Sequence, residues 1–172
     1  MNENTIVIFT GDNGTHSTIY TNTKTGIVKG GKGSTTDAGT NVPLVIKYPA
    51  QIKKGFVYEG LLEFSDFYPT FAEIAGAKIE KGDGQSFYGL LNGKKKFSRK
   101  TAFVHYEPRW GKKNTKKRFV RTTRYKLYQT GKFYDLSKDK LEKTPLETST
   151  LSKKELKVHK MLQKELDEAP EF

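Results

Sequence analysis

The most constraining feature of this sequence is a continuous apolar or β-branched stretch near its beginning, Thr5–Phe9, followed by Thr10-Gly11-Asp12-Asn13-Gly14. Such an unbroken run predicts a strand buried on both faces, as in a parallel sheet. Ligands of these sheets lie beyond the carboxyl ends of the strands, where Asp12 and Asn13 are expected. Their side-chain oxygens are hard donors that suit Ca²⁺ or Mg²⁺, although Asp-Asn-Gly alone also favours a simple turn. The strand comes almost at once in the chain, so we expect further protein upstream of it.

Composition excludes several kinds of site. The 172 residues contain no cysteine, which excludes disulfides, thiolate metal sites and a cysteine nucleophile within this sequence. No apolar run reaches the ~18 residues of a membrane-spanning helix, and the beginning has no signal-peptide pattern. The length allows one domain, or parts of two. We therefore expect no membrane span.

The net charge of +12 is concentrated in one stretch of the chain. Residues 94–126 contain 14 Lys and Arg and a single acidic residue, Glu107, whereas acidic residues outnumber basic ones by one in the remainder. Such a stretch favours a polyanionic partner, and it is equally typical of a solvated loop. We expect no nucleic-acid partner, because the charge is local and the interleaved aromatic residues fit a strand core.

A second motif follows at Gly30-Gly31-Lys32-Gly33. Glycines allow the backbone to approach an anion closely, and a lysine among them adds a positive charge. The spacing is not that of a nucleotide-binding P-loop, and the motif alone is more simply explained as a flexible surface turn. Its position between the Asp-Asn-Gly segment and a second apolar strand, 42–48, is what favours a functional site.

The remaining pattern predicts one helix in the first half, and antiparallel strands and a terminal helix in the second. Asp66 is expected as the N-cap of a helix over 67–75 that ends at Gly76, after a strand at 61–64. Ser152 and Glu155 form the sequence pattern of a capping box for the terminal helix. The expected strands of the second half are 101–106, 119–122, 125–129 and 132–136, with a tight turn at Gly131.

The motifs in this order resemble the sulfatase family of the alkaline-phosphatase-like superfamily. The matching segments are its second metal-binding motif (9–14), its lysine loop (30–43), its following helix (64–76), and the stretches 83–87 and 124–136. The resemblance implies an α/β fold. Residues 1–92 would be the C-terminal portion of an alkaline-phosphatase-like α/β sandwich. Residues 93–172 would be a small antiparallel-sheet subdomain with a C-terminal helix.

The resemblance also implies roles for individual residues. Asp12 and Asn13 would be two ligands of an active-site Ca²⁺, and Lys32 would be a catalytic residue that contacts the sulfate. His16 and His105 are candidates for contact with the substrate, although each is more simply explained as a loop or strand histidine. Asp37-Ala38-Gly39 stands where the family more often has Glu-Gly-Gly, and Asn41 where it often has arginine, which suggests a subfamily.

The implied function is that of a C-terminal fragment of a sulfuric ester hydrolase. The family makes its formylglycine nucleophile from a Cys/Ser-x-Pro-x-Arg motif, and this sequence contains no x-Pro-x-Arg. The formylglycine and the other metal ligands are expected in a missing N-terminal region, so the chain alone should be inactive. Its partners would be that region and a sulfate ester, including sulfated glycans. The parent sulfatase would be periplasmic or secreted, while the sequence itself assigns no location.

Two alternatives stay open at this point. One is a non-catalytic module that binds polyanions, such as sulfated glycans, through residues 94–126. The other is a different hydrolase of the alkaline-phosphatase superfamily, such as a phosphatase or a phosphonate hydrolase. Those enzymes usually build a two-metal site with several histidines, whereas His16 is the only histidine near the motifs.

Overall fold

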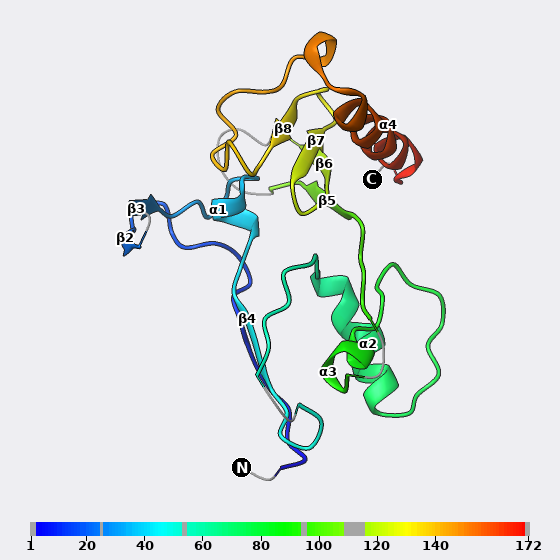
Figure 1. The fold of residues 1–172 in the computed structure, drawn as a ribbon. Helices are drawn as coiled ribbons and strands as arrows, with labels where there is room; N and C mark the ends of the chain where they lie inside the picture. Colours follow the sequence, from blue (N-terminus) through cyan, green and yellow to red (C-terminus); the bar gives the residue numbers. More distant parts are fainter. Residues whose placement is uncertain (1–2, 25, 53–54, 94–95, 109–115, 171–172) are drawn as a thin grey trace. The chain divides into compact units, whose positions relative to one another are not determined.

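The computed structural model describes residues 3–24, 26–52, 55–93, 96–108 and 116–170. The chain divides into two compact units, one of Met1–Phe9 and Val45–Ala102, the other of Thr10–Leu44 and Phe103–Phe172. Figure 1 gives the elements in order: β1 (Val7–Thr10), β2 (Tyr20–Thr23), β3 (Gly26–Lys29), α1 (Asp37–Thr40), β4 (Leu44–Lys47), a 3-10 turn (Phe64–Asp66), α2 (Phe67–Ile74), α3 (Tyr88–Leu91), β5 (Ala102–Tyr106), β6 (Lys117–Arg121), β7 (Tyr125–Tyr128), β8 (Phe133–Asp135), a 3-10 turn (Thr148–Thr150) and α4 (Lys153–Glu168). None of the helices in these ranges has the length and hydropathy needed to cross a bilayer.

The opening strand is where predicted, but its predicted burial is wrong. β1 and β4 form a two-stranded sheet, and residues of β1 alternate between exposed and half-buried. Phe9 is 65% exposed, and Val7 and Val45 are exposed as well. A strand buried on both faces needs strands on its two sides and cover above and below. Within the described ranges β1 has only β4 as a strand neighbour, so one side of it stays open.

Helix α2 begins and ends as the sequence predicts, but Asp66 does not cap it with its side chain. Asp66 belongs to the preceding 3-10 turn, has helical backbone angles, and makes no side-chain cap bond to α2. Its buried carboxylate instead accepts hydrogen bonds from the backbone N–H of Glu63 at 3.0 Å and Gln85 at 2.7 Å, and it pairs with Arg99. Of the predicted strand at 61–64, only an isolated bridge from Leu61 to Arg99 is present, and Phe64 already belongs to the 3-10 turn.

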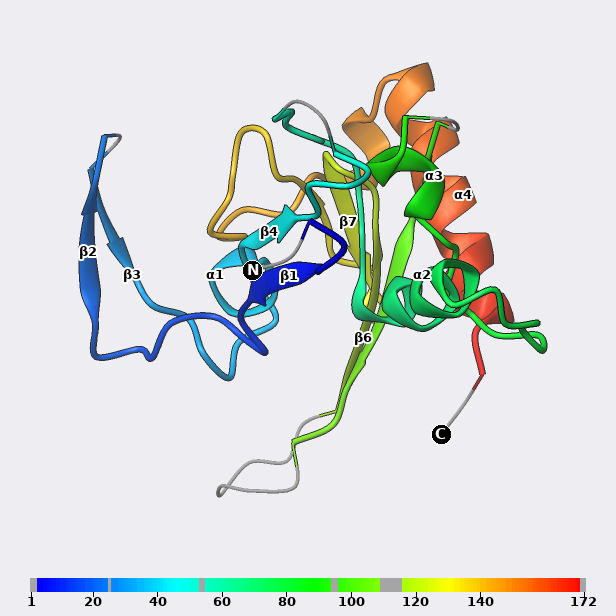
Figure 2. The same ribbon diagram turned by 90° about the horizontal axis from the view of Figure 1, so that it is seen from below.

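The second unit contains the larger sheet and the main core (Figures 1 and 2). Its strands lie in the order β5-β6-β7-β8, with antiparallel pairing of β6 with β7 and of β7 with β8. Gly131 has a φ of 80° in the turn between β7 and β8, a left-handed conformation that favours glycine. Helix α4 begins at the predicted capping box of Ser152 and Glu155 and packs against β6 and β7. The core between them consists of Val120, Tyr125, Leu127, Phe133, Leu162 and Leu166.

The same unit contains a β-hairpin that the sequence pattern did not predict. β2 and β3 pair from Tyr20 with Lys29 to Thr23 with Gly26, and every residue of both strands is exposed. Figures 1 and 2 both show the hairpin projecting away from α1 and the four-stranded sheet. The structure is thus a mixed α/β arrangement with small antiparallel sheets and a C-terminal helix. The wider sandwich and the division at residues 92 and 93 stay predictions.

Candidate functional site

The Asp-Asn-Gly segment and the lysine loop lie together in the second unit, joined by backbone hydrogen bonds. The N–H of Lys32 donates to the carbonyl of Thr15 at 2.9 Å, and the N–H of Gly14 donates to the carbonyl of Gly39 at 2.9 Å. Asp12 and Lys32 are exposed, whereas Asn13 is half-buried. Three segments (11–16, 30–34 and 36–41) therefore form one cluster of loops, which carries both predicted metal ligands and the predicted catalytic lysine.

Glycines allow the backbones of these three segments to lie in close contact. A side chain at Gly14 would overlap the carbonyl group of Ala38, and one at Gly39 would overlap the carbonyl of Ser34. A Cβ at Gly31 would lie 2.6 Å from the Cβ of Ala38. A real Cβ cannot be accommodated at such distances, so these glycines are required by backbone packing. Of the glycines that suggested a flexible turn in the sequence, Gly30 and Gly31 thus make close contacts within the loop cluster.

Of the two candidate histidines, His16 belongs to this cluster, whereas His105 lies on β5. His16 is exposed at the base of the β2–β3 hairpin, and its Nδ1 lies 2.9 Å from Thr18 Oγ1. His105 lies on β5, 3.3 Å from the carboxylate of Glu107. Hydrogen bonds, chiefly from Lys116 and then from His105, lower the pKa of Glu107. A role for either histidine in substrate binding stays a prediction.

The residue next to His105 contacts the lysine loop directly. The hydroxyl of Tyr106 on β5 donates to the carbonyl of Gly33 at 3.1 Å, immediately after Lys32. The sequence pattern assigned Tyr106 only to a strand. Alternation along β5 indicated that neighbouring side chains would face opposite sides, but it could not tell which side faces the loop.

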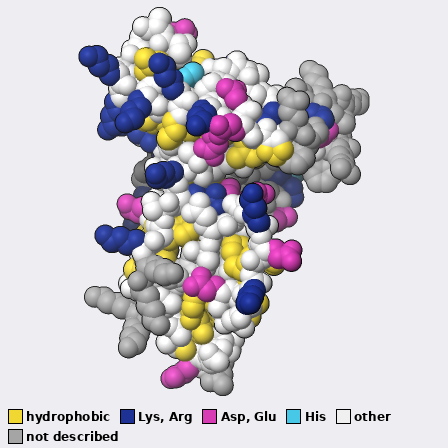
Figure 3. All heavy atoms as spheres, turned by 90° about the vertical axis from the view of Figure 1, so that its right-hand side faces the viewer, with side chains coloured by type: hydrophobic (Ala, Val, Ile, Leu, Met, Phe, Trp, Pro, Cys, Tyr) yellow, Lys and Arg dark blue, Asp and Glu magenta, His cyan; other side chains and the backbone are white. Residues whose placement is uncertain are grey.

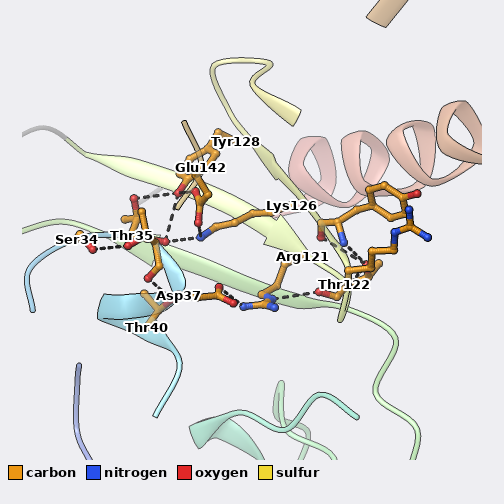
Figure 4. Close-up of polar contacts among 12 residues, drawn as sticks. Ser34, Thr35, Asp37, Thr40, Arg121, Thr122, Lys126, Tyr128 and Glu142 are labelled. Carbon is orange, nitrogen blue, oxygen red and sulfur yellow. Dashed lines mark hydrogen bonds and ion pairs between the residues drawn. The ribbon is translucent and has the colours of Figure 1, made fainter. Parts of the chain in front are cut away.

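Residues 34–37 are bonded to a polar network that includes side chains of the four-stranded sheet, shown in Figure 4. The ammonium of Lys126 donates to the carbonyl of Thr35 and pairs with Glu142 at 2.8 Å, and Arg121 pairs with Asp37 at 2.6 Å. Burial lowers the pKa of Lys126, and it raises the pKa of Tyr128, which hydrogen-bonds with Glu142. Sequence reasoning missed these contacts. The available signal was a lysine in the middle of a short aromatic and apolar strand.

Most of the described basic residues between 94 and 126 have partners within the protein. Nine Lys and Arg residues of this stretch lie in the described ranges, and the rest fall outside them. Six of those nine make internal ion pairs or hydrogen bonds: Arg99, Lys116, Arg118, Arg121, Arg124 and Lys126. Figure 3 shows Lys and Arg side chains interspersed with acidic and apolar ones on the face it displays. This distribution does not favour a module built around a polyanion-binding surface.

The side-chain oxygens of Asp12 and Asn13 in the loop cluster are suited to form part of a calcium site. In the portion of the chain that the structure describes, no group of three or more His, Asp or Glu lies close enough together to hold a metal ion. Calcium takes six to eight oxygen ligands, and Asp12 and Asn13 offer adjacent oxygens of the appropriate kind. These two residues thus suit Ca²⁺ chemically but cannot complete its coordination by themselves.

Sequence comparisons identify relatives of one enzyme class. The family model for the C-terminal part of N-sulphoglucosamine sulphohydrolase matches residues 32–171. The chain is 37% identical over 95 residues to an ulvan-active sulfatase of Formosa agariphila, covering 55% of this chain and 16% of that protein. It is 31% identical over 111 residues to human steryl-sulfatase, covering 59% and 19%.

Solved structures of sulfatases share the fold. A 2-O GAG sulfatase matches 94% of this chain with a TM-score of 0.70 and 26% identity, over 35% of its own length. A second structure, determined with its substrate D-glucosamine-2-N,6-O-disulfate, has a TM-score of 0.73 at 22% identity and covers 94% of this chain and 34% of its own. The chain therefore spans less than a fifth of these two curated relatives and about a third of these solved structures.

Proposed function

The chain belongs to the sulfatase family, as a C-terminal part of the N-sulphoglucosamine sulphohydrolase type, and from this premise we propose that it supplies part of an active site for sulfate-ester hydrolysis. The observation that carries the proposal is the backbone junction between the Asp12–Gly14 segment and the Lys32 loop. Because of that junction, two oxygen donors and one ammonium belong to a single cluster of loops. This is the set of groups that an anionic ester bound to a cation requires.

Asp12 and Asn13 would hold a Ca²⁺ ion together with ligands from elsewhere in the protein. When bound, a divalent cation polarises sulfate oxygens and orients the ester. The contribution of this chain is to present a carboxylate and an amide side by side. Gly14 fixes the backbone that carries them through its hydrogen bond to Gly39.

Lys32 would contact the sulfate group and stabilise negative charge that develops on the leaving oxygen. The side chain is exposed, so it is open to solvent in the absence of substrate. The backbone of Lys32 is held by Thr15, and that of Gly33 by Tyr106. An ammonium held by a fixed backbone can act on a developing charge with little reorganisation. His16 in the cluster and His105 on β5 are further candidates for substrate contact.

The substrate class is a sulfate ester, and a sulfated glycan is the form we favour. One relative is named an ulvan-active sulfatase, one structural neighbour is a 2-O GAG sulfatase, and another was determined with D-glucosamine-2-N,6-O-disulfate. A purely polyanion-binding function is less well supported, because most of the described basic residues from 94 to 126 have internal partners.

We predict that the purified chain alone does not hydrolyse sulfate esters, because it contains neither cysteine nor an x-Pro-x-Arg sequence from which a formylglycine could be made. The test uses 4-nitrophenyl sulfate with added Ca²⁺. Robust turnover by the chain alone would contradict the proposal.

The positive arm of this test supplies the missing groups. The chain is co-expressed with the N-terminal region of the ulvan-active relative, which must carry the nucleophile motif and the remaining metal ligands if the proposal is right. Turnover should require both parts. We call this pair the reconstituted enzyme.

A further inference from the structure

Lys126 is a fully buried lysine in the middle of β7, in the unit that contains the loop cluster. Its side chain has no exposed surface, and its ammonium pairs with Glu142 at 2.8 Å. The same ammonium donates to the carbonyl of Thr35 and lies 4.0 Å from the centre of the Phe119 ring. Burying a charged group is costly unless it is paired and hydrogen-bonded, and each of these contacts offsets part of that cost.

The network lies on the opposite face of the sheet from the helical core. Tyr125 and Leu127 belong to the core beneath α4, and side chains alternate along a strand, so Lys126 and Tyr128 face the other way. The hydroxyl of Tyr128 lies 3.1 Å from the hydroxyl of Thr35 and hydrogen-bonds with Glu142. Figure 4 shows that Lys126 and Tyr128 each contact both Thr35 and Glu142.

Thr35 is three residues beyond Lys32 and is itself buried. The segment that it anchors continues into α1, whose Gly39 accepts the hydrogen bond from Gly14. A movement of Thr35 would thus be transmitted in one direction to Lys32 and in the other to the Asp12–Gly14 segment. The Arg121–Asp37 ion pair holds the same segment at a second point.

An apolar residue at position 126 would pack in the sheet without an ion pair, and such replacements are often neutral or stabilising when both charges are removed. What the charged group adds is a strong polar contact. Hydrogen bonds to ions are shorter and stronger than neutral ones, so they hold the carbonyl of Thr35 more tightly than apolar contacts would. This argues for a role in positioning rather than in stability alone.

We propose that Lys126, Tyr128 and Glu142 are positioning residues that hold the lysine loop, and with it Lys32, in the geometry that sulfate hydrolysis requires. The inference rests on the proposed function for its catalytic consequence. Its structural part, control of the loop by this network, stands independently. The two parts are therefore tested by separate measurements.

The structural part is tested by amide hydrogen exchange in the full chain. Lys126→Met retains most of the apolar stem and removes the ammonium. The matched control is Arg124→Met, which breaks the neighbouring ion pair with buried Asp135 on the same sheet, away from Thr35. The probes are the amides of Lys32, Ser34 and Gly39, which have backbone hydrogen bonds, and the reference is the peptide covering α4.

We expect Lys126→Met to increase the exchange rate of the three probe amides at least tenfold relative to that of the α4 peptide. In Arg124→Met, the exchange rates of the loop amides and of α4 should change by the same factor. Unchanged loop exchange, or a rise only in step with α4, would overturn the proposal. Tyr128→Phe removes one hydroxyl and provides a milder second variant if Lys126→Met does not fold. It should increase loop exchange by a smaller factor, and no increase from it would count against the network.

The chain offers a direct rescue because it contains no cysteine. Lys126→Cys, unfolded, alkylated with 2-bromoethylamine and refolded, regains an ammonium on a side chain of matching length. Rescue should return loop exchange to that of the unsubstituted chain, and a failure to do so in a folded sample would oppose the proposal.

The catalytic part is tested in the reconstituted enzyme. Lys126→Met should lower kcat at least tenfold, while Arg124→Met should leave kcat within about twofold. An increase in loop exchange without loss of kcat would show that the network orders the loop but does not serve the reaction. If the reconstituted enzyme had no sulfatase activity at all, the proposed function would fail while the exchange result would still decide the control of the loop.

Discussion

Asp135 is a carboxyl group of the four-stranded sheet whose pKa is lowered in the folded protein. It is almost fully buried on β8 and accepts hydrogen bonds from Arg124 Nε at 3.0 Å and Nη2 at 2.7 Å, and from the Ser137 hydroxyl at 2.6 Å. These contacts, chiefly the hydrogen bonds from Arg124, lower the pKa of Asp135 to about 2. An aspartate in an unfolded chain titrates near ~3.9, so folding favours the ionised form of this residue.

We predict that this carboxylate makes stability depend on pH in acid. Because the pKa is lower in the folded state, its contribution is complete above about pH 4 and is lost as the pH falls toward about 2. The expected size is about 1 kcal/mol, since Arg124 is half-exposed and water screens the pair. Urea unfolding of Asp135→Asn and of the unsubstituted chain between pH 2 and 7 gives the free energy of unfolding at each pH. At acidic pH this free energy should change less with pH in Asp135→Asn than in the unsubstituted chain. Identical pH dependence of the two proteins would contradict the assignment.

Asp66 shows what a sequence can and cannot indicate about one residue. Its position directly before α2 follows from the turn residues and the apolar helix pattern. Its actual partners, Gln85 and Arg99, are 19 and 33 residues away, and nothing local specifies them. The same holds for Lys126, whose partners Thr35 and Glu142 lie 91 and 16 residues away. The local sequence pattern predicts the secondary-structure element in which a residue lies. Contacts with residues distant in the sequence decide what that residue does in the fold.

Helix α4 is the element in which local signals and tertiary contacts agree. Ser152 accepts from the backbone N–H of Glu155, and the Glu155 carboxylate accepts from the backbone N–H of Ser152. Leu162 and Leu166 are buried in the core against the sheet, while Met161 is 40% exposed. The four-residue spacing of Val158, Leu162 and Leu166 in the sequence predicts which side of this helix packs, and the structure confirms that Leu162 and Leu166 pack against the core.

We predict that Leu162→Ala lowers the free energy of unfolding of the second unit by about 3 kcal/mol, because it removes a fully buried side chain and leaves a cavity. The matched control is Met161→Ala, one residue away on the exposed side, for which less than about 1 kcal/mol is expected. Chemical unfolding followed by circular dichroism compares the two. Equal losses for both variants would contradict the packing of α4.

The strands and the hairpin show why other elements were harder to predict. β5 to β8 were predicted to within a few residues because apolar and aromatic residues are bounded by turn signals. The β2–β3 hairpin was not, because its strands contain Thr, Asn and Lys and bury no side chain. The burial of β1 was overestimated for a related reason. A sequence shows that a strand is apolar, but not which neighbour covers it.

At the scale of the whole molecule, the lysine loop belongs with the C-terminal sheet rather than with the rest of the first half. Thr10–Leu44 and Phe103–Phe172 form one compact unit, linked by Tyr106, Arg121 and Lys126. The predicted site residues Asp12, Asn13, Lys32, His16 and His105 all lie in this unit. The sequence indicated the two motifs and their family, but it could not show that the C-terminal sheet supports the loop.

The central claim is that this unit contributes Asp12, Asn13 and Lys32 to a sulfatase active site. The most direct test measures kcat/KM of the reconstituted enzyme on an aryl sulfate for Asp12→Ala, Lys32→Ala and the surface control Met161→Ala. We predict losses of about 100-fold or more for Asp12→Ala and Lys32→Ala, and a change within about twofold for the control. Activity that persists in both Asp12→Ala and Lys32→Ala would contradict the account.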